Sequence, residues 1–154
     1  MDKIFDVINA TRKNFLNLVN SLSIEQLNIV PQGFNNNIAW NFGHAIVSQQ
    51  IICYARARLE PVLQAWLIEK YQIGTRPEAF IDHDEINLLG EQLFLMIEQL
   101  SEDIKADLFQ QYEPFTTRFG VDINSINDAI KYFAMHDGLH FGYSMALKKL
   151  VVNS

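Results

Sequence analysis

The sequence predicts an all-α protein, a four-helix bundle, from three observations. Apolar residues recur every three or four positions along four long stretches, at about residues 2–22, 38–59, 82–100 and 124–151, which is typical of amphipathic helices. No stretch shows convincing alternation of apolar and polar residues, as a half-buried strand would. The connection between the second and third stretches, roughly residues 60–82, is long for neighbouring antiparallel helices. It could span the bundle and make these two helices parallel.

The composition fits one globular domain over residues 1–154. The chain has 154 residues, 49% of them hydrophobic and 19% charged, so it can bury a sizeable core. Its formal net charge is −6, and no Lys/Arg cluster interrupts that acidic balance. Such a chain is a poor candidate for binding nucleic acid or an anionic membrane.

The sequence also favours an intracellular location. Its start has no apolar run of signal-peptide type, and no stretch approaches the roughly 20 apolar residues of a membrane span. The single cysteine, Cys53, excludes an intramolecular disulfide and fits a reducing compartment. We therefore expect a cytoplasmic protein.

The first helix is expected over about residues 2–22, where apolar side chains repeat on one face. Ser23 has the position of an N-cap for a short helix over residues 24–27. A loop follows, and Asn37 should cap the next helix.

The second helix, expected over about residues 38–59, carries His44 on a mostly apolar face that should look inward. Cys53 lies about 180° from His44 round an α-helix. It could therefore share a metal ion with His44 only if the helix were broken, and we expect a small buried side chain instead. Pro61 should open a further short helix that runs through residue 71. The other residues on the His44 face are Trp40, Val47, Ser48 and Ile51.

The third helix should open at Asp82, whose spacing from Glu85 resembles a capping box, and run to Leu100. A second restart is expected at Ser101, followed by a loop. His83 lies beside the helix cap among acidic residues, so we expect a solvated surface side chain.

The fourth helix should begin near Asn124 and continue to about Val151. His136 and His140 lie on one face of it, because residues four apart on a helix are neighbours. Asp137 is about 100° away from His136 round the helix, which makes it a flanking group rather than a metal ligand. The same face also carries Ala129, Tyr132, Phe133, Tyr143 and Leu147.

These histidines suggest a mononuclear metal site. Two imidazoles at i and i+4 can bind one metal ion, and His44 is the natural third ligand if the bundle brings its helix alongside. Neutral nitrogen ligands suit Zn, Ni or Fe rather than Mg or Ca. The alternative is that these are core histidines satisfied by hydrogen bonds, which is the usual role of one histidine on an apolar face.

Several other sites are excluded by the sequence. The metalloprotease motif requires Glu directly after its first histidine, and here Asp137 follows His136. A ferritin-like di-iron bundle needs Glu-x-x-His pairs, which the sequence lacks. It also lacks a glycine-rich phosphate loop and a zinc-ribbon cysteine pattern.

Three segments resemble the DinB/YfiT-like superfamily, and the resemblance covers nearly the whole chain. The segments are residues 22–27 (Leu-Ser-Ile-Glu-Gln-Leu), residues 37–44, which end in Asn-Phe-Gly-His, and residues 136–143 (His-Asp-Gly-Leu-His-Phe-Gly-Tyr). The resemblance implies an up-down-down-up bundle, often a homodimer, with a divalent metal on His44, His136 and His140. It also implies relatives that are thiol-dependent transferases or isomerases. Family members often carry Gln where this chain has Tyr143, so no role is carried over for that residue.

Two classes of function remain open. The first is a metal-dependent enzyme that acts on a small molecule, either by hydrolysis or by thiol transfer. The family resemblance implies a bacillithiol-like or glutathione-like thiol as the cosubstrate. The second is a non-catalytic bundle that binds metal or a small ligand. An enzyme should show an open cavity with polar groups beyond the metal ligands, whereas a structural site should be closed. No general acid or base can be named from the sequence.

Overall fold

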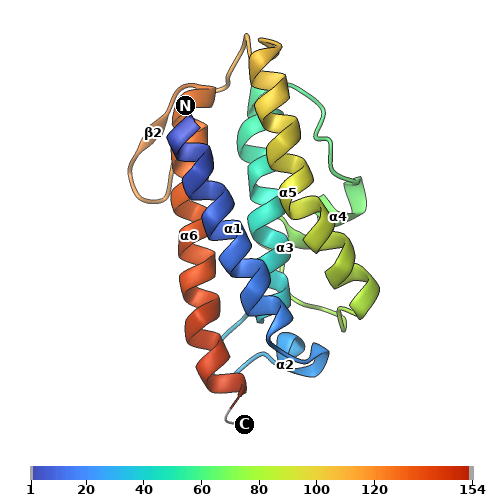
Figure 1. The fold of residues 1–154 in the computed structure, drawn as a ribbon. Helices are drawn as coiled ribbons and strands as arrows, with labels where there is room; N and C mark the ends of the chain where they lie inside the picture. Colours follow the sequence, from blue (N-terminus) through green and yellow to red (C-terminus); the bar gives the residue numbers. More distant parts are fainter. Residues whose placement is uncertain (1, 153–154) are drawn as a thin grey trace.

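The computed structural model describes residues 2–152, which form a mostly helical bundle (Figure 1). Its long helices are α1 (Asp2–Asn20), α3 (Ile38–Gln49), α5 (His83–Lys105) and α6 (Ile126–Val151). Helices α1 and α6 run in one direction, and α3 and α5 run in the other (Figure 1). The predicted four-helix bundle and its up-down-down-up order are therefore confirmed. No helix within residues 2–152 is long and apolar enough to cross a membrane.

Two short helices lie in the connections. Helix α2 (Ile24–Asn28) is capped by Ser23, whose hydroxyl accepts from the Gln26 amide while the Gln26 side chain accepts from the Ser23 amide. Helix α4 (Ala65–Tyr71) begins later than predicted, so Pro61 does not open it. The amides of Val62 and Leu63 bind the Gln50 side-chain oxygen, which holds this segment outside the helix.

The second long helix does not continue as an α-helix to residue 59. It changes to a wide π-turn, η1 (Gln50–Tyr54), and then to a tight 3₁₀ turn, η2 (Ala55–Ala57). The Ala55 amide donates to the carbonyls of both Gln50 and Ile51, which marks the change in winding. Cys53 is buried, as predicted.

Helix α5 is continuous, so the predicted restart at Ser101 is wrong. Asp103 is buried at the inner face of this helix and accepts hydrogen bonds from Tyr54 and Gln99. The polar residues from Ser101 onward resembled the start of a new helix, whereas the tertiary partners of Asp103 satisfy its carboxylate within one continuous helix. The predicted Asp82 cap is present, because its carboxylate accepts from the Glu85 amide at 2.9 Å.

A small hairpin precedes α6 and was not predicted. Strands β1 (Phe115–Thr116) and β2 (Asp122–Ile123) pair antiparallel. With two residues each, these strands are too short for alternation to be visible in the sequence. The turn passes through Gly120 in the left-handed region at φ +76°, and Ile123 anchors the hairpin in the core.

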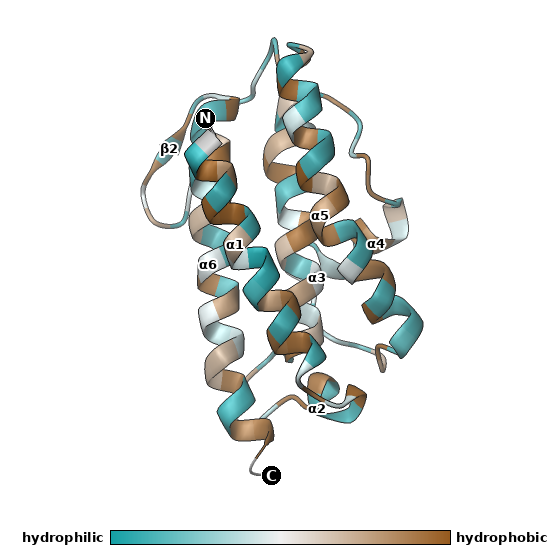
Figure 2. Ribbon diagram, in the orientation of Figure 1, coloured by the Kyte–Doolittle hydropathy of each residue, from teal (hydrophilic) through white to brown (hydrophobic). Residues whose placement is uncertain are grey.

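Apolar and hydrophilic residues alternate along the long helices (Figure 2), and the apolar ones form two core clusters. One cluster surrounds Phe15 and Phe42, and the other surrounds Ile8 and Phe133. Val19 and Tyr54 are buried in these clusters. Both side chains therefore belong to the core.

A buried polar layer lies between the two clusters and joins all four long helices. Arg12 Nε on α1 is 2.8 Å from Asp137 Oδ2 on α6, and Arg12 Nη1 donates to the Leu93 carbonyl of α5 at 2.6 Å. Gln49 on α3 donates to the Met96 carbonyl of α5 at 2.8 Å. We refer to Arg12, Gln49 and Asp137 as the polar layer. The sequence pattern did not reveal Arg12 as a core residue.

Candidate metal centre

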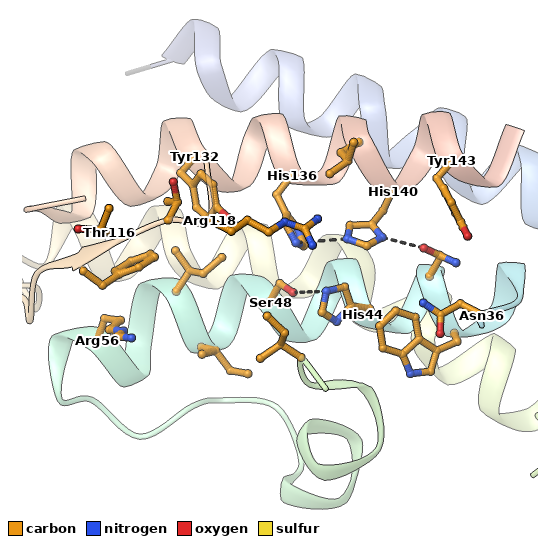
Figure 3. Close-up of a pocket in the computed structure, with 18 residues that line it drawn as sticks. Asn36, His44, Ser48, Arg56, Thr116, Arg118, Tyr132, His136, His140 and Tyr143 are labelled. Carbon is orange, nitrogen blue, oxygen red and sulfur yellow. Dashed lines mark hydrogen bonds between the residues drawn. The ribbon is translucent and has the colours of Figure 1, made fainter. Parts of the chain in front are cut away.

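Helices α3 and α6 bring three histidines together inside the bundle (Figure 3). One ring nitrogen from each of His44, His136 and His140 lies within 4.8 Å of the other two. The Nε2 atoms of His136 and His140 are 3.2 Å apart. The ring centroid of His44 lies 4.6 Å from that of His140 and 5.2 Å from that of His136. The structure thus assembles the three residues singled out in the sequence, whereas the fourth histidine, His83, is exposed.

His140 is oriented by the cap of α3. The Asn37 side chain accepts from the Trp40 amide at 2.8 Å and so begins the helix. The Asn37 carbonyl accepts from Asn41 Nδ2 at 2.7 Å, which leaves Asn41 Oδ1 to accept from His140 Nδ1 at 2.7 Å. A proton fixed on Nδ1 leaves the lone pair of His140 on Nε2, the atom that faces the cluster. Sequence reasoning missed Asn41, although it lies one turn before His44.

His44 is oriented by a main-chain carbonyl of α4. Its Nδ1 donates to the Tyr71 carbonyl at 2.6 Å, so its Nε2 is also unprotonated. Trp40 stacks on the His44 ring with centroids 4.5 Å apart, and Ser48 Oγ lies 3.2 Å from His44 Nε2. These contacts hold the imidazole at one face, by Trp40, and at both ring nitrogens.

Gly43 allows α4 to approach His44 this closely. A Cβ atom at Gly43 would lie 2.5 Å from the Tyr71 ring, which is closer than real Cβ contacts come. The Tyr71 hydroxyl donates to Glu85 at 2.6 Å, and Lys70 forms an ion pair with the same carboxylate at 2.6 Å. Glycine at position 43 and Glu85 on α5 therefore place the carbonyl that orients His44.

His136 differs from the other two histidines. Its Nδ1 atom is buried and has no hydrogen-bond partner within residues 2–152. Asp137, the next residue, is paired with Arg12 in the polar layer and lies outside the cluster, as predicted. Of the two ring nitrogens of His136, Nε2 alone has a hydrogen-bond partner within the described residues, and that partner is His140 Nε2.

The electrostatic environment keeps the three imidazoles neutral. Burial lowers the pKa of His44, lowers that of His136 to about 3 and lowers that of His140 to about 2. The Arg118 charge lowers the pKa of all three further, and positive charge on His44 would oppose protonation of the other two. Neutral imidazoles are the form that binds a transition metal.

The cluster borders a cavity of about 550 Å³. Exposed residues such as Arg118 and Tyr143 line part of it, so the cavity reaches the protein surface. Its wall combines apolar side chains such as Ile51 and Ile73 with the hydroxyl of Ser48. Cys53 does not line it, and burial raises the pKa of its thiol. An open cavity that combines apolar walls with a few polar groups is typical of a small-molecule binding site.

The family model described as the DinB superfamily matches residues 8–144. A crystal structure of a conserved protein from Enterococcus faecalis has the same fold, with a TM-score of 0.66 and 13% sequence identity. That alignment covers 99% of this chain and 97% of the Enterococcus faecalis chain. No curated protein matches this sequence significantly.

Proposed function

The chain belongs to the DinB superfamily, and from that premise we propose that it is a mononuclear metal-dependent enzyme acting on a small molecule. His44, His136 and His140 would hold one divalent transition metal, Zn, Ni or Fe. The observation that carries the proposal is the convergence of three neutral imidazoles at one wall of an open cavity.

The donor set fits such an ion. Two nitrogen ligands about 2.0–2.1 Å from a tetrahedral ion lie roughly 3.4 Å apart, and the Nε2 atoms of His136 and His140 are 3.2 Å apart. The hydrogen bonds from His44 to Tyr71 and from His140 to Asn41 direct the lone pairs of both rings to the same region. A divalent ion held by neutral ligands keeps its full charge and lowers the pKa of a coordinated water or thiol.

The residues of the chain have separate tasks in this proposal. Asn41 and the Tyr71 carbonyl fix the ligand tautomers. Trp40 and Tyr132 line the cavity beside the histidines and would exclude water from the substrate. The Ser48 hydroxyl lies 3.2 Å from His44 Nε2, where it can donate a hydrogen bond to a group bound in the cavity.

The reaction we propose is transfer of a low-molecular-weight thiol to an electrophilic small molecule. The thiol loses its proton to solvent, its sulfur forms a bond to the electrophilic carbon, and the leaving group departs from that carbon with the bonding electron pair. The only thiol of the chain, on Cys53, is fully buried outside the cavity, and its pKa is raised by burial. A reacting thiol must therefore come from solution, and a bacillithiol-like or glutathione-like cosubstrate would suit the family. Hydrolysis at the same site is the competing outcome of the activity screen.

Metal binding is tested first. The protein in a Trp66→Phe background keeps Trp40, which stacks on His44, as its one tryptophan. We expect one zinc per chain by elemental analysis, and a change in Trp40 fluorescence on titration with zinc. His140→Ala should abolish both signals, and exposed His83→Ala should abolish neither. Equal zinc binding by His140→Ala and the parent protein would refute the site.

Activity is tested next on protein loaded separately with Zn, Ni, Fe or Mn. Each form is combined with electrophiles and a panel of low-molecular-weight thiols, and with ester and amide substrates. Turnover that requires a thiol and disappears in His140→Ala supports the transferase. Thiol-independent turnover of esters or amides would replace it with a hydrolase, and no turnover in either panel would favour a non-catalytic bundle.

A further inference from the structure

The cavity is positively charged although the protein is acidic. Two arginines, Arg56 and Arg118, line it, and no Asp or Glu does. The whole chain carries a formal net charge of −6, so this local excess of positive charge opposes the overall balance. Positive charge in a partly enclosed cavity attracts anionic ligands more strongly than it would on an open surface.

Arg118 is held close to the histidines by the hairpin. It lies in the tight turn between β1 and β2, where the Gly120 amide donates to the Thr117 carbonyl at 2.9 Å. The buried Thr117 side chain accepts from the Val121 amide at 3.1 Å, which braces the same turn. Figure 3 shows Arg118 reaching toward His136. Its charge acts on all three histidines, whose pKa values it lowers.

Arg56 provides a second cation farther along the cavity. Its guanidinium lies over the Phe115 ring, 4.6 Å from the ring centroid, near Thr116 at the hairpin end of the site (Figure 3). Within residues 2–152, neither Arg56 nor Arg118 makes an ion pair or a side-chain hydrogen bond. Both guanidinium groups thus keep donors available to a ligand, and a guanidinium matches the geometry of a carboxylate or a phosphate.

We propose that the molecule bound at the histidine site carries an oxyanion group, a carboxylate or a phosphate, which Arg118 binds while Arg56 adds a second positive charge. This proposal rests on the proposed function for the group of the molecule that reacts at the metal. The new part is that the opposite end of the molecule is anionic and is recognised by Arg118 of the hairpin. Arg118 is therefore a specificity-determining residue of the cavity.

The test compares charged and neutral thiols on the zinc-loaded protein. The probes are ω-mercaptoalkanoates of increasing length and the matching ω-mercaptoalkanamides, which differ from them only in the charge of the distal group. Dissociation constants are measured by calorimetry. At the best chain length we expect the carboxylate to bind about tenfold more tightly than its amide, as a charge-assisted hydrogen bond provides.

The variants separate the cavity arginine from general charge effects. Arg118→Gln should reduce the carboxylate-to-amide preference to about one, and Arg118→Lys should restore part of it. Lys131→Gln removes an equal charge from the exposed face of α6 outside this cavity and should leave the preference unchanged. Equal binding of carboxylate and amide by the parent protein, or equal losses in Arg118→Gln and Lys131→Gln, would overturn the proposal.

A second arm does not depend on the metal. Inorganic phosphate is titrated into the metal-free protein, and its binding is followed by phosphorus NMR line broadening. Broadening by the parent but not by Arg118→Gln supports the anion site, and equal broadening by both contradicts it. If the parent fails to bind zinc, the proposed function fails, and the phosphate titration alone decides on the anion site.

Discussion

The buried histidines make the stability of the metal-free protein depend on pH. The pKa of His136 is about 3 in the folded protein and near 6.5 in an unfolded chain. Between these two pH values the unfolded state binds more protons than the folded state. The contribution of neutral His136 to the free energy of unfolding is therefore fully present above about pH 6.5 and is lost as the pH falls toward 3. His44 and His140 have lowered pKa values too and act in the same direction.

We therefore predict that the free energy of unfolding of the metal-free protein decreases on acidification from pH 7 to pH 5. Each buried histidine contributes about 1.4 kcal/mol per pH unit below its unfolded pKa. Urea denaturation at several pH values measures the slope. His136→Asn should flatten the slope by about one proton, and an unchanged slope would show that His136 is accessible to protons in the fold.

At the residue scale, the sequence predicts the metal ligands better than it predicts the groups that orient them. The spacing of His136 and His140 follows from helix geometry alone, and His44 was inferred because its helix face is apolar. The Tyr71 carbonyl that orients His44 has no side-chain signal, since any residue has a carbonyl. Arg118 lies in a turn whose place beside the histidines depends on how the hairpin packs.

At the scale of elements, the contact between α3 and α4 controls the geometry of His44. Gly43 leaves the space that the Tyr71 ring occupies, and the Tyr71 carbonyl binds the imidazole. A methyl group at position 43 would push the α4 segment away and disturb this hydrogen bond. Overpacking of this kind typically costs about 1–3 kcal/mol.

We predict that Gly43→Ala destabilises the fold by about 1–3 kcal/mol and weakens zinc binding at least about tenfold by misorienting His44. Gly138→Ala is the matched control, because it lies on α6 between the two ligands and its Cβ would meet no atom within 4 Å. That change should be neutral or stabilising by up to about 1 kcal/mol. Urea denaturation and zinc calorimetry on both variants decide the matter, and equal effects would contradict the role given to Tyr71.

Element boundaries show where periodicity stops being informative. The long helices have apolar repeats of sufficient length, and the helix caps at Ser23, Asn37 and Asp82 are local hydrogen bonds that the sequence can reveal. The late start of α4 depends on Gln50, twelve residues earlier than Val62. The continuity of α5 at Asp103 depends on Tyr54 from another helix. Both features depend on tertiary contacts between residues far apart in the chain, so local sequence patterns could not predict them.

At the scale of the whole molecule, the polar layer couples the four helices. Arg12 and Asp137 are each 1% exposed, so each charge depends on the other for compensation. Removing one partner leaves an unpaired buried charge, which typically costs about 3–5 kcal/mol. Replacing both partners with apolar residues removes that penalty.

We predict that Arg12→Met and Asp137→Leu each destabilise the protein by about 3–5 kcal/mol, and that the double variant recovers most of the loss. Equilibrium unfolding of the four proteins gives the coupling energy. Lys3→Met provides the control, because it breaks an exposed ion pair with Asp6 and should leave stability unchanged. Additive losses in the double variant would show that the two charges act independently.

The wide turn at Gln50–Tyr54 has a consequence for which single-residue deletions the second long helix can accept. A π-turn holds one residue more than an α-turn, so it is the form a helix takes when it has accepted a one-residue insertion without shifting its flanks. A chain lacking Ile52 can rewind this turn as an ordinary α-helix, and it should still bind zinc. A chain lacking Val47 would rotate Ser48 and Gln49 by about 100° relative to His44 before the π-turn can restore the register, and we expect it to lose zinc binding. We therefore expect this helix to tolerate loss of a residue within Gln50–Tyr54, directly after the segment that carries His44.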